Sequence, residues 1–265
     1  MDMKPVNAQT ALACLLRDPY RYLAEIVALA RNIPPIPREI YADADPASVV
    51  MLIEQYPHSD TPSITVTRYD AAFLRAAVTE RLAGLERFSL GSPDRQVLEA
   101  PEIREVFEVG QVSVHRSFVC TSLDSVPPLE TDAKPLTAAE REAFVVYPSP
   151  AGEHGPSADD LFRWLVVEGR GEILAVCEQG HISGYLSCAP EYEHIWDLEF
   201  IHVRPERRGR GLATRLAVAY ARRRLTAGQI PCWSSAANEA SERTATTAGF
   251  TCCRELHAAE ATRRP

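Results

Sequence analysis

A turn rich in glycine and arginine most constrains what this chain can fold into. It reads Val203-Arg204-Pro205-Glu206-Arg207-Arg208-Gly209-Arg210-Gly211-Leu212-Ala213-Thr214. The alternating apolar segment before it, Ile195 to Val203, predicts a β-strand, and the apolar-periodic segment after it, Leu212 to Leu225, predicts a helix. The turn therefore lies at a helix N-terminus, where free backbone N–H groups and the positive end of the helix dipole favour an anion.

Arginine is concentrated in this turn and in the helix that follows. Between residues 204 and 224 there are eight arginines and one acidic residue, Glu206, although the chain as a whole has a net charge of −8. Gly209 and Gly211 lack a Cβ atom, so the backbone can come close to a ligand. Together these features indicate a ligand that carries phosphate groups.

Three kinds of glycine-rich phosphate-binding turn come close to this pattern. A P-loop requires a Gly-Lys pair, and none follows here. A dinucleotide-binding turn requires Gly or Ala where this chain has Thr214, and no βαβ unit opens the chain. The third pattern is Arg208-x-x-Gly211-x-Ala213. At this point the sequence resembles the GNAT superfamily of acyl-CoA-dependent N-acyltransferases, whose pyrophosphate loop has this form.

The order of elements extends this resemblance from about Leu165 to Glu255. Before the loop, two apolar runs on either side of Gly180 predict a hairpin. After the predicted helix the family has a strand, an Asn-containing turn and a short helix that ends in Gly-Phe. The matching segments here are Ile230 to Ser234, Asn238 to Ser241, and Ala248-Gly249-Phe250.

The resemblance implies a fold and an activity for residues 126–265. The fold is α/β, with a mixed, mostly antiparallel central sheet flanked by helices; a capping box at Thr137 and Glu140 precedes the expected first helix. The activity is that of an N-acetyltransferase, which moves an acetyl group from acetyl-CoA to a primary amine within a ternary complex. No metal is implied. The acceptor is not identified, because variable loops build the acceptor pocket in this family.

The resemblance also assigns residues to the binding of acetyl-CoA. The loop would hold the pyrophosphate through backbone N–H groups, and arginine side chains could reach the 3′-phosphate. Backbone atoms on the preceding strand would bind the pantetheine, and Asn238 matches an Asn that contacts the CoA arm. The implied cofactor-binding residues are Ile201, His202, Val203, Arg208, Gly209, Arg210, Gly211, Leu212, Ala213, Thr214 and Asn238.

The catalytic residues depart from the family pattern. Many GNAT enzymes have a Tyr seven residues after that Asn as the acid for the thiolate, and this chain has Ala245 there. Ser241 is the best remaining proton donor, unless it only caps the helix. Asp197 and Glu199 are two residues apart and are expected on one face of the strand. Glu199 is the candidate base for the amine; the alternative is that both carboxylates simply face solvent.

The missing Tyr leaves a second function open, a non-catalytic acyl-CoA-binding or interaction module. A nucleic-acid-binding function is disfavoured because the sequence pI is about 5.5 and no aromatic residues alternate with the basic ones. Seven scattered cysteines without a C-x-x-C motif predict a reducing compartment and argue against a zinc site. No apolar run long enough for a transmembrane helix occurs, and no signal peptide opens the chain, so a cytoplasmic protein without membrane contacts is expected.

Prolines divide the chain near residue 126 into residues 1–125 and 126–265. The first part is predicted to be an additional α/β lobe, with helices over residues 22–31 and 71–88 and a strand over 112–122. Asp70 is the expected N-cap of the second helix. The role of this lobe is not apparent from its residues; a degenerate GNAT-like half is one possibility. The sequence does not indicate the oligomeric state.

Overall fold

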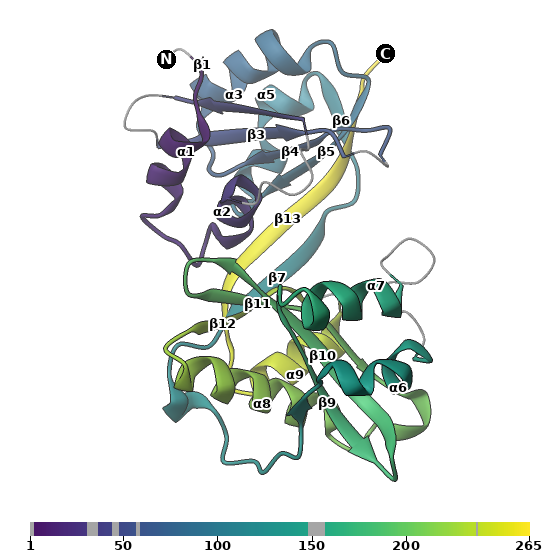
Figure 1. The fold of residues 1–265 in the computed structure, drawn as a ribbon. Coiled ribbons are helices and arrows are strands. Elements are labelled where there is room, and N and C mark those ends of the chain that lie inside the picture. The colour runs from purple at the N-terminus through teal and green to yellow at the C-terminus, as the bar shows by residue number, and fades with distance from the viewer. Residues whose placement is uncertain (1–2, 31–36, 44–47, 57–58, 148–156, 237) are drawn as a thin grey trace. The chain divides into compact units, whose positions relative to one another are not determined.

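The computed structural model describes residues 3–30, 37–43, 48–56, 59–147, 157–236 and 238–265. The chain forms two compact units, residues 1–116 with 254–265, and residues 117–253 (Figure 1). It passes between them within two strands, β7 (Ser113–Val119) and β13 (Thr251–Arg263). The prolines predict a single division near residue 126, whereas the observed first unit ends at Arg116 and also includes the C-terminal segment.

The first unit is built on a sheet with the strand order β1-β2-β3-β4-β5-β13, and β6 also pairs with β13. The β4–β5 pair is parallel, and the other pairs in this unit for which a register is described are antiparallel. The strands are β1 (Lys4–Pro5), β2 (Arg38–Ala42), β3 (Val50–Glu54), β4 (Ser63–Val66), β5 (Arg87–Ser92) and β6 (Phe107–Val109). The helices are α1 (Ala8–Leu15), α2 (Leu23–Ala30), α3 (Ala71–Ala77), the π-helical turn η1 (Val78–Leu82), α4 (Gln96–Glu99) and α5 (Pro101–Arg104).

The helix predicted from residue 71 begins where expected, and Asp70 caps it by accepting the N–H of Phe73 at 2.8 Å. It ends at Leu82 rather than at Phe88. The residues after it join the sheet as β5, where Phe88 is buried against Phe107. Tertiary packing therefore overrides the helical periodicity at this end of the segment.

The second unit contains a sheet in which β12, β11, β10, β9 and β8 follow one another, with the end of β7 beside β12. Its strands are β8 (Lys134–Pro135), β9 (Glu172–Glu178), β10 (His181–Tyr192), β11 (Ile195–Val203) and β12 (Ile230–Ala236). Its helical segments are η2 (Leu123–Ser125), η3 (Ala138–Glu140), α6 (Arg141–Val145), α7 (Ala158–Phe162), η5 (Arg163–Val167), η6 (Pro205–Arg207), α8 (Leu212–Thr226) and α9 (Glu239–Thr247). The β11–β12 pair is parallel, and the neighbouring pairs from β8 to β11 are antiparallel. The predicted fold class, α/β with a mostly antiparallel sheet flanked by helices, is therefore confirmed.

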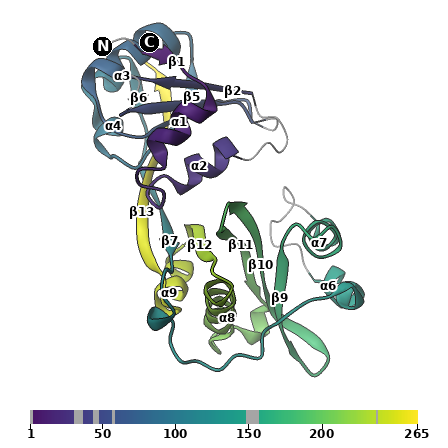
Figure 2. The same ribbon diagram turned by 60° about the vertical axis from the view of Figure 1, so that its left-hand side comes forward.

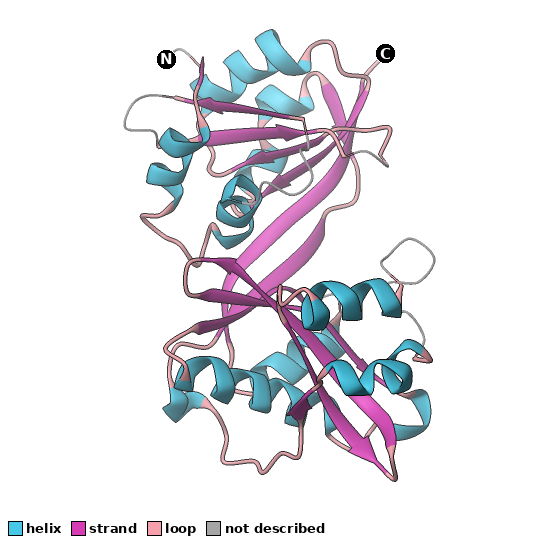
Figure 3. Cartoon of the chain, in the orientation of Figure 1, coloured by secondary structure: helices cyan, strands magenta, loops and turns pink. Residues whose placement is uncertain are grey.

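Two apolar cores cover the two faces of this sheet. Helices α8 and α9 pack on one face over a core that includes Leu198, Tyr220 and Phe250. Helices α6 and α7 pack on the other face over a core that includes Phe144 and Tyr185. Figures 2 and 3 show the same division between the pair α8 and α9 and the pair α6 and α7. Side chains at alternate positions of a strand thus pack against different helices and belong to different apolar cores.

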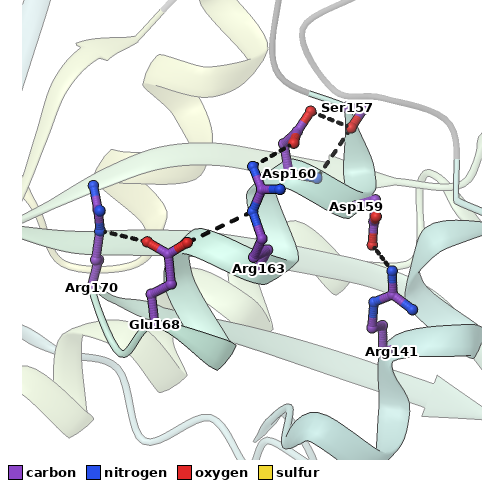
Figure 4. A network of polar contacts seen from close by, with 7 residues as sticks. All are labelled: Arg141, Ser157, Asp159, Asp160, Arg163, Glu168 and Arg170. Atoms are coloured by element: carbon purple, nitrogen blue, oxygen red, sulfur yellow. Dashed lines mark hydrogen bonds and ion pairs between the residues drawn. The ribbon is translucent and has the colours of Figure 1, made fainter. Parts of the chain in front are cut away.

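The first helices of this unit confirm the predicted capping box. Glu140 accepts the backbone N–H of Thr137 at 2.7 Å, and α6 follows. The segment after residue 126, where the prolines are concentrated, contains both β8 and α6, while residues 148–156 lie outside the described part. Ser157 caps α7, and exposed ion pairs link Arg141 to α7 and surround Arg163 (Figure 4). Such exposed pairs contribute at most about 1 kcal/mol each, so they orient these helices more than they stabilise them.

Candidate active site

The parallel strands β11 and β12 separate at the edge of the sheet where both end. Their pairing runs from Ile195 to Asp197 on β11, although each strand continues, to Val203 and Ala236. The pairing ends at Asp197. The carboxylate of Asp197 accepts hydrogen bonds from the backbone N–H of Ser234 at 2.8 Å and from the hydroxyl of Ser234 at 2.6 Å. Beyond Asp197 the described residues of β12 offer no ladder partner to β11. Because β10 pairs with only alternate backbone groups of β11, the other backbone groups beyond Asp197 have no partner strand among the described residues, and the carbonyl of Val203 accepts Nε of Arg208.

A β-bulge on β11 lies at the start of this opening. Ser187 pairs with Phe200 and Cys188 with Leu198, so Glu199 is the extra residue. The alternation of side chains shifts at this point: Leu198 and Ile201 both pack beneath α8, whereas Phe200 packs on the opposite face. A bulge thus interrupts the simple two-residue alternation on which the expected shared face of Asp197 and Glu199 was based.

The N-termini of α8 and α9 lie at the same edge, because each helix follows the carboxyl end of one of these two strands. Gly211 precedes α8 with a φ of +72°, and no side chain caps the helix. The first hydrogen bond of the helix runs from the N–H of Arg215 to the carbonyl oxygen of Gly211, at 3.0 Å. A Cβ atom at Gly209 or Gly211 would meet no atom within 4 Å, so the space over the turn is open. Within the described chain, no hydrogen-bond acceptor is found for the N–H groups of Leu212, Ala213 and Thr214.

Glycine is required in this turn by the backbone itself. The φ of Gly209 is +75° and that of Gly211 is +72°, both in the left-handed region. Other L-residues adopt that region at a cost of roughly 1–2 kcal/mol. The two glycines therefore hold the shape that turns the first N–H groups of α8 outward, toward an anion.

Most of the arginines around the loop make contacts within the protein, which corrects the interpretation of this cluster as mainly a phosphate site. Arg204 donates to the carbonyl of Ile182 and lies 4.8 Å over the ring of Tyr147. The other arginines engaged in this way, by carboxylates or carbonyl groups, are Arg207, Arg215, Arg222, Arg223 and Arg224.

The last two arginines of the cluster are Arg208 and Arg210. Arg208 donates from Nε to the carbonyl of Val203 at 3.1 Å, which ties the loop to the end of β11. Arg210 is exposed, and it makes no ion pair or hydrogen bond to any residue that the structure describes. Both side chains are at the turn itself, beside the uncapped end of α8.

Helix α9 brings Asn238 and Ser241 to this edge. The side chain of Asn238 caps α9 by accepting the N–H of Ser241 at 3.0 Å. Ser241 is therefore not the cap, and its hydroxyl has no hydrogen-bond partner in the described part of the chain. Ala245 is one turn further along the same face and is fully buried between α9 and α8.

His202 lies on the opposite face of β11, in an aromatic cluster for which the sequence pattern contains no signal. Its ring is 5.2 Å from that of Tyr147 and 6.1 Å from that of Tyr185, its neighbour across the strands. Burial, and then the charges of Arg208 and Arg204, lower the pKa of His202 below its ordinary value. The Nδ1 atom of His202 and the hydroxyl of Tyr185 are buried without a partner among the described residues. The lowered pKa favours the neutral form of the ring, in which one nitrogen can accept a hydrogen bond.

The described residues include neither a metal-binding group nor a membrane-spanning helix. They contain no group of three or more His, Cys, Asp and Glu side chains placed to hold a metal ion. No helix among them is both long enough and apolar enough to cross a lipid bilayer.

Residues 136–250 match the model of the acetyltransferase (GNAT) family. A search of the curated proteins found no match for the chain. Among the solved structures that resemble it is a GCN5-related N-acetyltransferase from Sphaerobacter thermophilus, at 12% identity and a TM-score of 0.63 over 99% of this chain and 96% of that one. An acetyltransferase of the GNAT family from Colwellia psychrerythraea matches at 13% identity and 0.58, over 98% of this chain and 99% of that one.

A third similar structure is a tandem GNAT protein from the clavulanic acid biosynthesis pathway. It matches at 12% identity and a TM-score of 0.55, over 100% of this chain and 99% of that one. At this identity the three structures show the fold, and the family model shows which part of the chain carries the acetyltransferase sequence. Residues 136–250 thus match the acetyltransferase (GNAT) family in sequence and solved GNAT acetyltransferases in fold, which supports an acyltransferase.

Proposed function

We propose that the protein transfers the acetyl group of acetyl-CoA directly to a primary amine in a ternary complex. The observation that carries this proposal is the pairing of two features at one edge of the sheet. The N-terminus of α8 is uncapped behind a left-handed Gly211, and β11 loses its partner strand beyond Asp197. The first feature suits a pyrophosphate and the second suits the amide groups of a pantetheine arm.

The residues present fit acetyl-CoA, which when bound supplies the acetyl thioester. We assign the pyrophosphate to the N–H groups from Gly209 to Thr214, and the 3′-phosphate to Arg208 or Arg210. Backbone groups of residues 201–203 on β11 are assigned to the pantetheine, and Asn238 to the CoA arm. Because the cap bond occupies the side-chain oxygen of Asn238, its amide NH₂ is the group we assign to this contact.

Amide formation joins the amine nitrogen to the acetyl carbon and breaks the bond from that carbon to sulfur. The amine loses a proton, and the departing thiolate gains one. Ser241 is our candidate donor to the thiolate, since its hydroxyl is on the first turn of α9 and the helix cap does not use it. Glu199 is our candidate base, because the bulge places it where β11 and β12 begin to separate.

His202 is a second candidate base, and pH profiles distinguish it from Glu199. Its pKa is lowered by burial, Arg208 and Arg204, so it accepts a proton above that lowered pKa and loses this ability as the pH falls through it. An acid limb of kcat/KM that belongs to His202 would therefore lie below pH 6.5. We expect Glu199→Gln to remove the acid limb and His202→Gln to leave it in place. The opposite assignment of the limb would make His202 the base.

The fold of the first unit supports its interpretation as a degenerate GNAT-like half. Strand β4, helix α3 and strand β5 repeat the arrangement of β11, α8 and β12: two parallel neighbouring strands joined by a helix. The two helix starts differ in one respect. Asp70 places its carboxylate on the N-terminus of α3, whereas no side chain caps α8 after Gly211. A fixed carboxylate occupies the position that a phosphate would need.

We therefore expect one acetyl-CoA bound per chain. Isothermal titration calorimetry of the full-length protein measures this stoichiometry directly. If two molecules bind per chain and Gly211→Asp abolishes just one of them, the first unit has retained a CoA site and its assignment as degenerate is wrong.

The alternative is a non-catalytic acyl-CoA-binding module, and the buried Ala245 in place of the family Tyr favours it. A thiol-release assay with acetyl-CoA and a panel of amines, peptides and aminoglycosides separates the two functions. We expect turnover that saturates in both substrates and that leaves no acetyl group on the protein by intact-mass spectrometry. Binding of acetyl-CoA without turnover of any acceptor would support the module instead.

The seven free cysteines support our placement of the protein in a reducing cytoplasm.

A further inference from the structure

A cavity lies at the C-terminal end of α8, away from the glycine loop. Its volume is about 690 Å³, within the range of small-molecule sites. The C-terminal part of α8, the starts of β9 and β11 and the segment around Ala133 line it. From Gly211 to Arg224 the helix rises about 20 Å, so this cavity is well separated from the proposed pyrophosphate site. Nothing in the proposed acetyl transfer uses it.

The outer wall of the cavity is fastened to α8. Arg222 donates to the carbonyl groups of Pro127 at 2.6 Å and Leu129 at 2.8 Å. Arg215 pairs with Asp132 at 2.5 Å. These contacts fix the segment that leads to the lining residues Thr131 and Ala133. The cavity is therefore preformed by specific contacts.

The lining combines positive charge with an apolar floor. Arg224 is 3% exposed, with its guanidinium 3.8 Å from the ring centroid of Trp196. Its Nε atom is buried and has no hydrogen-bond partner within the described chain. Arg223 also lines the cavity, and Glu172 is the one carboxylate there. Glu172 forms ion pairs with both Arg223 and Arg224. Burial alone would raise the pKa of Glu172, but the hydrogen bonds and charges of the two arginines outweigh it. The net pKa is below the ordinary value, so Glu172 remains ionised.

We propose that this cavity binds a small organic anion with an apolar body, such as an aromatic carboxylate or a phosphate monoester. The anionic group would meet Arg223 and the unpartnered Nε of Arg224, since three arginines face a single carboxylate here. The apolar body would lie against Trp196, Leu174 and Ala219. A buried N–H donor without an acceptor is costly, and an anion in the cavity would satisfy it.

Calorimetry on the full-length protein with two probes, phenyl phosphate and benzoate, tests this site. Benzyl alcohol serves as the neutral control. Both titrations are repeated with CoA at saturation, which separates the cavity from the glycine loop. We expect at least one anion to bind with or without CoA, and benzyl alcohol to bind at least tenfold more weakly. The better of the two anions shows whether carboxylate or phosphate is preferred.

Two variants at exposed positions locate the binding. Arg223→Gln removes one charge, and Ala227→Trp fills the mouth of the cavity; each should weaken the anion at least tenfold. Arg170→Gln, which loses an exposed ion pair to Glu168 (Figure 4), is the matched control and should bind as the wild type does. Circular dichroism establishes that the variants are folded. The proposal is overturned if neither anion binds, if CoA displaces them, or if both cavity variants retain wild-type affinity.

Discussion

Gly211→Asp is expected to reduce the affinity for acetyl-CoA by about 100-fold or more, which corresponds to about 2.7 kcal/mol. The substitution puts a carboxylate at the N-terminus of α8, where the N–H groups of the first turn would otherwise face the pyrophosphate. A Cβ atom at this position meets no atom within 4 Å, so the fold should survive the change. Gly211→Trp should also abolish binding, because its bulk fills the same space. Calorimetry with acetyl-CoA measures both effects.

Gly228 provides a matched control at the opposite end of the same helix. Its φ is also +72°, and a Cβ atom there also meets no atom within 4 Å. Gly228→Asp therefore introduces the same charge with the same backbone strain, but far from the loop. We expect it to retain the acetyl-CoA affinity of the wild type. If a folded Gly211→Asp or Gly211→Trp variant binds acetyl-CoA as tightly as Gly228→Asp does, the assignment of this loop is wrong.

Ser241→Ala is expected to lower kcat by about ten- to a thousandfold, a loss of roughly 1.4–4 kcal/mol of transition-state stabilisation. The reason is that Ala245 leaves no hydroxyl at the family Tyr position. Ser241 lies one turn earlier on the same face of α9, whereas the hydroxyl of Thr244 bonds back to the carbonyl of Ala240. The N–H of Ser241, rather than its side chain, makes the cap bond to Asn238. The variant should therefore keep the cap and the stability of the wild type. Steady-state kinetics on the best amine found measures the change.

Thr246→Val is the matched control for this prediction. Thr246 is an exposed residue of the same helix whose hydroxyl bonds back to the carbonyl of Glu242 at 3.0 Å. Loss of this hydroxyl should leave kcat within about twofold of the wild-type value. An unchanged kcat in Ser241→Ala would mean that water protonates the thiolate, and the enzyme would then work by positioning its substrates.

The elements around the loop were predictable because their periodicity agrees with their final packing. The segments predicted as β11 and α8 have nearly the observed bounds, and the hairpin around Gly180 is β9 and β10. The end of the helix after Asp70 was harder to predict, because its helical pattern continues into residues that form strand β5 in the sheet of the first unit. Where the C-terminal strand belongs depends on contacts distant in sequence, which local pattern does not contain.

The loop was predictable as a motif, whereas the contacts of its charged residues were not. The glycines of the loop have left-handed conformations, which the absence of a Cβ atom permits. The bulge at Glu199 breaks the two-residue alternation and has no signature in sequence letters. The pairing of Arg223 and Arg224 with Glu172 was also hidden, because that carboxylate is far away in the chain. A cluster of residues with the same sign of charge in a sequence therefore does not distinguish a ligand site from internal ion pairs.

Amide hydrogen exchange with and without acetyl-CoA tests the proposed acetyl-CoA site, because it reports where on the chain the ligand lies. We expect slower exchange upon binding at two places: residues 201–203 at the end of β11, and residues 209–214 at the loop and the start of α8. The β9–β10 hairpin turn around Gly180 should be unaffected. Protection confined to the C-terminal end of α8, or binding without protection at residues 209–214, would contradict the proposed site.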